Sequence, residues 1–264
     1  MSKSSPNIVL MLVEGESDST LLVPSFQALF DERDATPEMR APKGWRVWGS
    51  EFRCNVATLS MFPQNARNAG LLVNADVRAV VRDRVKSYIL DSDIRKRSYA
   101  YVVQVIDLDG AFIPDGQVLQ GSHDKVEYSD TTIAVRNPEC QRKIMHAKRD
   151  AIRSLMGLES VEGIPYRLFY VSRNLEHAFL GDAHDFETAQ KQINAAKLAV
   201  RFSNSPQEFQ RILDALYVMH GGDRQLEDDG DSWYRSWKYV MEQPAASLGR
   251  GSNLAMLPKF VVPR

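Results

Sequence analysis

Three carboxylates stand where apolar runs of the sequence end. Asp107 and Asp109 close the run YVVQVIDLDG, and Glu14 follows the run NIVLMLV. The two aspartates are two positions apart, so their side chains point the same way if the chain stays extended. Carboxylates this close together need a cation to remain ionised, and their oxygen atoms suit a hard divalent ion such as magnesium. The alternative is that residues 107–110 form only an acidic turn.

Strands must position each of these carboxylates. Residues 7–13 and 101–110 contain runs of apolar residues, the second with Val102, Val103, Val105 and Ile106, which is the pattern of strands buried on both faces. Residues 166–171 form a third such run, and a short strand is expected near residues 45–47. In an open α/β sheet, ligands bind at the carboxyl ends of the strands. The sequence therefore predicts that the carboxylates lie at the ligand-binding edge of a sheet.

Helical segments separate these strands. Residues 16–30 have apolar side chains at helical spacing, but Pro24 predicts a kink or two short helical pieces. Residues 74–90 form an amphipathic helix, and residues 138–156 form another that Asn137 caps. This order of strand, helix and strand predicts an α/β fold with a mainly parallel sheet flanked by helices.

The two strand ends together resemble the Toprim domain. The resemblance rests on VEGESD at residues 13–18 and IDLDG at residues 106–110, and it covers residues 7–112. Toprim domains occur in topoisomerases, primases and overcoming-lysogenization-defect nucleases, and in RloB-like and Abi-type proteins of bacterial defence systems. The resemblance implies a compact Rossmann-like sheet that binds magnesium for cutting or joining phosphodiester bonds.

By position, Glu14 matches the glutamate of the family, and Asp107 and Asp109 match its aspartate pair. The resemblance thus implies that these three residues bind magnesium, with manganese as the alternative ion. Topoisomerases often carry a further acidic residue two places beyond the pair, where this chain has Ala111. This departure weakens a topoisomerase interpretation more than a nuclease one.

A fourth carboxylate follows the third strand, in the stretch SRNLEHAF. In RloB-like and Abi-type proteins, a turn with Ser and Asn followed by an acidic residue resembles this stretch. The resemblance makes Glu176 a candidate for an additional metal-binding or water-positioning residue. The alternative is a surface glutamate at the start of a helix.

Basic residues line one face of the helix predicted at residues 138–156. Arg142, His146, Arg149 and Arg153 follow one another at spacings of four, three and four. Such a stripe, together with Arg173, could contact a phosphate backbone, or it could be only the solvated side of a helix.

Composition limits the classes of protein. The chain has 264 residues, 44% of them hydrophobic, and a net charge of −1, so a nucleic-acid surface must be a local patch. Cys54 and Cys140 are too few for a zinc cluster or a disulfide scaffold, which favours a reducing cytoplasm. No apolar stretch approaches the length that crosses a membrane.

We expect two regions. Residues 1–182 hold the Toprim-like α/β domain, and residues 183–264 form a mostly helical elaboration without a recognised catalytic signature. Helical spacing indicates helices at residues 186–201 and 206–220 and a short aromatic helix at residues 233–241.

These features predict a magnesium-dependent nuclease that hydrolyses phosphodiester bonds of DNA or of RNA, including tRNA. Small proteins of this kind resemble effector subunits of bacterial antiviral defence that work beside a separate ATPase, and this chain has no P-loop of its own. The sequence also leaves open whether the chain forms a homodimer. The non-enzymatic alternative is a Toprim-like module that binds or regulates a partner protein.

An alternative from another enzyme class is a phosphatase of the haloacid-dehalogenase type. There Asp107 would be the nucleophile and Asp109 the general acid or base. That family begins near its N-terminus with this strand and continues with Thr, where this chain has Ala111. Its late acidic pair follows an apolar strand, whereas Asp228 and Asp229 follow GGDRQLE. The phosphatase interpretation also leaves VEGESD unexplained.

Overall fold

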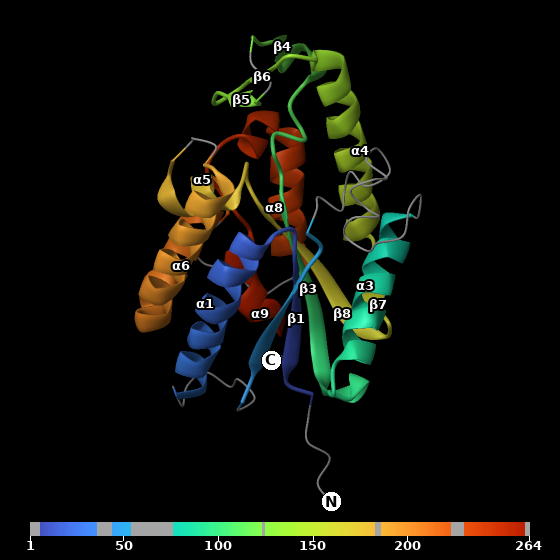
Figure 1. The fold of residues 1–264 in the computed structure, drawn as a ribbon, viewed down its shortest axis with the longest axis vertical. Helices are drawn as coiled ribbons and strands as arrows, with labels where there is room; N and C mark the ends of the chain where they lie inside the picture. The colour runs from blue at the N-terminus through green and yellow to red at the C-terminus, as the bar shows by residue number, and fades with distance from the viewer. Residues whose placement is uncertain are drawn as a thin grey trace, which may run out of the picture.

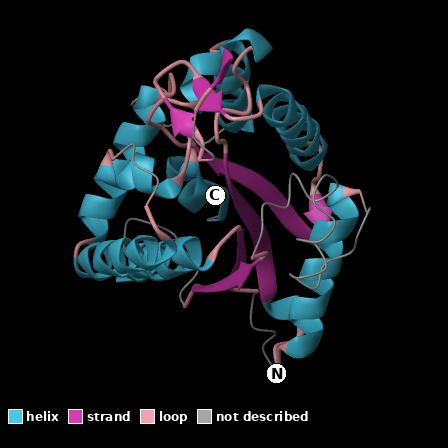
Figure 2. Ribbon diagram, turned by 45° about the horizontal axis from the view of Figure 1, so that its top comes forward, coloured by secondary structure: helices cyan, strands magenta, loops and turns pink. Residues whose placement is uncertain are grey.

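The computed structural model describes residues 6–35, 44–53, 76–122, 125–182, 186–222 and 230–261. Its centre is a five-stranded sheet with helices on both faces (Figures 1 and 2). The strands in spatial order are β2 (Arg46–Glu51), β1 (Ile8–Val13), β3 (Tyr99–Asp107), β8 (Ile164–Val171) and β7 (Ser160–Val161). The first four are parallel, and β7 pairs antiparallel with β8. The predicted α/β class and mainly parallel sheet are therefore confirmed.

Strand β1 shows why the apolar runs become central strands. All six of its residues are buried, because helices cover both faces of the sheet. Val9, Met11 and Val13 face one core, whereas the alternate residues face the other. The strand is paired on both edges, with β2 on one side and β3 on the other. Its carboxyl end is therefore held rigidly.

One face of the sheet is covered by α1 (Glu16–Ala35), α6 (Thr188–Asn204), α7 (Pro206–Met219) and α9 (Leu257–Val261). Helix α1 is continuous through Pro24, so of the two expected outcomes, a kink or two short pieces, the second is wrong. The apolar side chains on both sides of the proline, including Leu21 and Phe26, are fully buried. This packing offsets the backbone hydrogen bond that a proline removes.

The other face is covered by α3 (Val77–Asp91), α4 (Pro138–Met156) and α8 (Gly230–Glu242). Helix α4 begins where the sequence predicts, and the Asn137 side chain accepts a hydrogen bond from the Cys140 amide at 3.0 Å. Helix α3 begins at Val77 with Asp76 as its cap. Residues 74 and 75 lie outside the described residues, as do Cys54, Asp228 and Asp229.

The region after residue 182 shares both cores with the sheet. Helices α6 and α7 pack on one face, and Trp237 of α8 is fully buried on the other. Asn253 also accepts a hydrogen bond from the Tyr170 amide of β8 at 2.8 Å, and Ser252 forms a β-bridge with Val171. The predicted C-terminal elaboration thus packs directly on the sheet.

A second, three-stranded sheet follows β3 in the chain. Its strands are β4 (Val118–Gln120), β6 (Ile133–Val135) and β5 (Glu127–Tyr128), in that spatial order. It lies beyond the carboxyl end of the main sheet, at the top of Figure 1. Met145 of α4 and Leu248 help to form its small core. None of the helices in the described ranges is long and apolar enough to cross a membrane.

Candidate active site at the carboxyl end of the sheet

Glu14 and Asp107 lie at the same edge of the main sheet, since they end the neighbouring parallel strands β1 and β3. A cavity of about 610 Å³ opens at this edge. Its wall combines acidic residues with two basic ones: Glu14, Gly15, Glu16, Ser17, Asp18, Glu51, Arg53, Asp107, Glu176 and Lys191. The structure therefore brings Glu14, Asp107 and Glu176 to one cavity, as the sequence predicts.

Glu14 is a carboxylate of this wall whose charge is poorly compensated. Its Oε1 atom is buried and has no hydrogen-bond partner among the described residues. Burial raises the pKa of Glu14 to about 8; Lys148 opposes this rise, whereas Asp109 and Asp18 add to it. At neutral pH the side chain therefore takes up a proton or needs a cation beside it.

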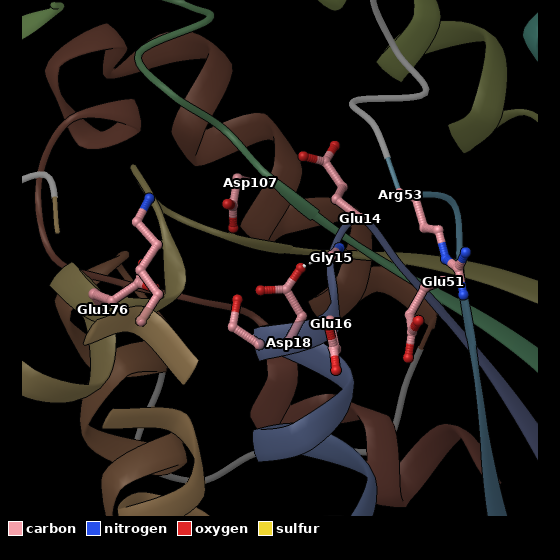
Figure 3. A pocket seen from close by; sticks show the side chains of 10 residues that line it. Glu14, Gly15, Glu16, Asp18, Glu51, Arg53, Asp107 and Glu176 are labelled. Carbon is pink, nitrogen blue, oxygen red and sulfur yellow. Dashed lines mark hydrogen bonds between the residues drawn. The ribbon is translucent and has the colours of Figure 1, made fainter. Parts of the chain in front are cut away.

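The pKa of Asp107 is also raised. Burial raises its pKa well above the ordinary value, and the negative charges of Asp18, Asp109 and Glu14 raise it further. Figure 3 shows the side chains of Asp107 and Asp18 turned toward each other. Several carboxylates thus repel one another in one cavity, which is an arrangement that favours binding of a cation.

Asp18 has two roles. Its side chain accepts a hydrogen bond from the Gly15 amide at 2.9 Å, which is the capping-box contact between the third residue of α1 and the residue before the helix (Figure 3). The same carboxyl group lines the cavity, where burial raises its pKa to about 6 despite that hydrogen bond, and Glu176 adds to the rise. The sequence pattern around Asp18 did not indicate that its carboxyl group would line the cavity.

Asp109 departs from the position expected for an extended chain. Strand β3 ends at Asp107, and Asp109 has a left-handed backbone with φ of 47°. Its side chain is not part of the cavity wall and instead accepts a hydrogen bond from Lys148 Nζ at 2.6 Å. The two aspartates therefore point to different places, because the strand stops between them.

Lys148 is a charged residue near the cavity that was not expected from the sequence. It lies on α4 and its side chain is only 3% exposed. Burial alone would lower its pKa, but the charges of Asp109 and Glu14 outweigh burial and raise it. A signal was present in the sequence, since Lys148 falls at helical spacing between the buried Met145 and Ile152.

Glu176 and Arg173 follow strand β8. Glu176 is buried in the first turn of α5 (Leu175–Leu180), where Asn174 caps the helix by accepting the His177 amide at 2.9 Å. Arg173 is 2% exposed and its guanidinium lies 4.6 Å from the centre of the Tyr128 ring. It therefore faces the small sheet, outside the cavity wall.

The basic stripe of α4 is engaged within the chain. Arg142 donates hydrogen bonds to the backbone oxygens of Asp115 and Val118, at 3.0 and 3.1 Å. The Asp115 carboxylate lies 2.8 Å from His146 and 3.2 Å from Arg149. These contacts attach α4 to the segment that enters the small sheet. Arg153 is exposed and pairs with Asp150 at 3.4 Å on the same helix.

Two basic residues of the cavity wall were not expected from the sequence. Arg53 follows β2, and Lys191 lies on α6. Figure 3 shows Arg53 and Glu176 on opposite sides of the cavity. No local motif marks either position, because their neighbourhood depends on how α6 and β2 pack around β1.

The donor atoms of the cavity suit a hard divalent cation, since Glu14, Asp18 and Asp107 supply only carboxylate oxygens and one of these is buried and unpaired. As the side chains are placed, no group of three or more His, Cys, Asp or Glu residues within the described ranges forms a ready metal site.

Comparisons of the chain with protein-family models, with curated proteins and with solved structures found no match. They therefore assign no family to the chain.

Proposed function

We propose that the protein is a magnesium- or manganese-dependent Toprim-type nuclease that hydrolyses phosphodiester bonds. The observation that supports this most directly is the pair of carboxylates at the ends of β1 and β3. Glu14 and Asp107 line one cavity, burial raises the pKa of both, and Oε1 of Glu14 has no partner in the described part of the chain. Glu14 and Asp107 would hold the metal ion.

A bound divalent ion supplies charge stabilisation on the phosphate oxygens and lowers the pKa of an attacking water. The protein supplies the rest of the site. Asp18 and Glu176 line the same cavity and would orient the water by accepting its hydrogen bonds. Arg53 and Lys191 would bind phosphate oxygens at the wall of the cavity.

The substrate in this proposal is a nucleic acid, either DNA or RNA, including tRNA. A cavity of about 610 Å³ is in the range that encloses a small ligand or a single nucleotide rather than a duplex. As part of the same proposal, the chain acts as an effector subunit of antiviral defence beside a separate ATPase.

The test is metal-dependent cleavage of plasmid, single-stranded DNA and total tRNA by the native protein and by Glu14→Ala and Asp107→Ala. We expect cleavage that needs magnesium or manganese and that each substitution lowers at least about 100-fold, since loss of even an outer partner of a metal site costs 10- to 100-fold. Glu139→Ala is the matched control, because Glu139 is an exposed carboxylate paired with Lys143 on α4.

Cleavage that survives in both variants, or that persists in a chelator, would contradict the proposal. A native protein that binds manganese through Glu14 and Asp107 but cleaves none of the three substrates would favour the alternative of a non-catalytic binding module.

A further inference from the structure

Lys148 is a charged residue in an apolar helix face. Helix α4 buries Met145, Ile152 and Leu155 toward the rest of the molecule, and Lys148 lies on the same face with its side chain 3% exposed. A buried ammonium is costly unless an acidic partner compensates it. Here the partner is Asp109, whose Oδ2 atom accepts a hydrogen bond from Nζ at 2.6 Å. The fold therefore places one permanent positive charge beside the carboxylate cavity.

The backbone holds Asp109 in the position that meets this lysine. Its amide donates to the carbonyl of Arg173 at 3.0 Å, and the next amide, of Gly110, donates to the carbonyl of Ser247 at 3.0 Å. A side chain at Gly110 would collide with Leu248 and Ile133, and the φ of +70° there also favours glycine. The turn after β3 is thus fixed on both sides, and the Asp109 carboxylate is directed to α4.

This geometry divides the acidic residues into two sets. Asp107 and Glu14 line the cavity, whereas Asp109 is absent from its wall and is paired with Lys148. An Asp-x-Asp pair in an extended strand would offer both carboxylates to metal ions. In this chain the second carboxylate, that of Asp109, is already paired with the ammonium group of Lys148.

We propose that Lys148 takes the place of a second metal ion, so that the cavity holds a single divalent cation and Asp109 is not one of its ligands. This inference rests on the proposed function, because it concerns the same metal site. Lys148 is a positioning residue in this scheme, since it acts through Asp109. Its ammonium pairs with Asp109, and Glu14 and Asp107, whose negative charges it offsets only in part, are left to bind the ion.

The experiment measures the number of Mn²⁺ ions bound by the full-length protein, from the free Mn²⁺ signal in electron paramagnetic resonance. The variants are Lys148→Met, which keeps an unbranched side chain in the apolar face, and Asp109→Asn. Lys143→Met is the matched control, because Lys143 is exposed on the same helix. Circular dichroism checks that each variant is folded.

We expect one Mn²⁺ per native chain and one per chain of the Lys143→Met control. Lys148→Met should bind two, because Asp109 is released and its charge is uncompensated. Asp109→Asn should still bind one, with an affinity within about threefold of native, which is less than the 10- to 100-fold cost of disturbing a metal ligand's partners. A purely structural role for Lys148 would leave the number of bound ions unchanged.

Two ions bound by the native chain would overturn the inference, as would a single ion in folded Lys148→Met. A loss of affinity beyond about tenfold in Asp109→Asn would overturn it as well, since Asp109 would then behave as a ligand. A folded native protein that binds no Mn²⁺ would instead overturn the metal site of the proposed function and, with it, this inference.

Discussion

Two groups of charged residues differ in how far their charges are paired within the chain. Most of the basic stripe of α4 is paired inside the chain, since Arg142 donates to two backbone oxygens and the Asp115 carboxylate contacts both His146 and Arg149; Nε of Arg149 has no partner among the described residues. The acidic residues at the sheet edge have few such partners. Burial raises the pKa of Glu14 and Asp107, and Oε1 of Glu14 is unpaired among the described residues.

The difference separates charged groups that are paired within the fold from uncompensated charged groups that are candidates to bind a ligand. A charged group paired within the chain contributes to the native structure, whereas a buried carboxylate without compensation lowers stability. A cluster of the second kind in a cavity is a candidate functional site on physical grounds. The three predictions below probe this difference, beginning with the largest expected effect on stability.

The first prediction concerns pH. The pKa of Glu14 rises from 4.5 in the unfolded chain to about 8 in the folded protein, so the folded state holds the proton more tightly. Its contribution to stability is fully present below about pH 4.5 and is lost as the pH rises through about 8. Burial and neighbouring charges act in the same direction on Asp107 and Asp18.

Without metal, the free energy of unfolding should therefore fall by a few kcal/mol between about pH 5 and pH 8.5, since each unit of pKa shift corresponds to about 1.4 kcal/mol. Urea unfolding in a chelator measures this change. Glu14→Gln should show a smaller fall, and the exposed control Glu139→Gln should follow the native protein. An equal pH dependence in Glu14→Gln would show that Glu14 is not the uncompensated group. Added magnesium should restore stability at the higher pH.

The second prediction concerns the basic stripe. Arg142→Gln should lower the free energy of unfolding by about 1–3 kcal/mol, because it removes two hydrogen bonds from a charged donor to backbone oxygens. Chemical denaturation measures the loss. The proposed nuclease activity, measured per folded molecule, should not change. A fall in activity without a change in stability would place Arg142 with the substrate instead.

The smallest effect is expected for Arg153→Gln. Arg153 is exposed, and its ion pair with Asp150 joins two residues of the same helix turn. Such pairs contribute little, so the free energy of unfolding should stay within about 0.5 kcal/mol of native. Nucleic-acid affinity, measured by fluorescence anisotropy over a range of salt concentrations, should also stay unchanged. A weaker affinity with a smaller salt dependence would assign the stripe to the nucleic-acid surface.

Local patterns in the sequence were sufficient for the long strands of the main sheet and for most of the long helices, but not for the short strands β4, β5, β6 and β7. Strand β1 and helix α4 begin and end close to where their apolar spacing and caps indicate, because both depend on neighbouring residues in the chain. Helix α1 is the exception. Its continuity through Pro24 depends on helices α6 and α7, whose contacts no local pattern contains.

The candidate site was predictable only in part. Parallel strands bring their carboxyl ends to one edge, so an apolar run ending in an acidic residue was enough to place Glu14 and Asp107 together. Lys148 carried a weaker signal, as a lysine in an apolar helix face. No sequence pattern marked Arg53 or Lys191, because their side chains reach the cavity wall only through packing between distant segments.

The sequence by itself determined the α/β class and the sheet edge at which its acidic residues gather, since strand burial and strand direction are encoded in short apolar runs. Tertiary structure alone decided which charges are compensated. Asp107 and Asp109 belong to one short motif, yet a left-handed turn sends one to the cavity and the other to Lys148, 39 residues later in the chain. Compensation depends on distances between atoms, which spacing along the chain does not specify.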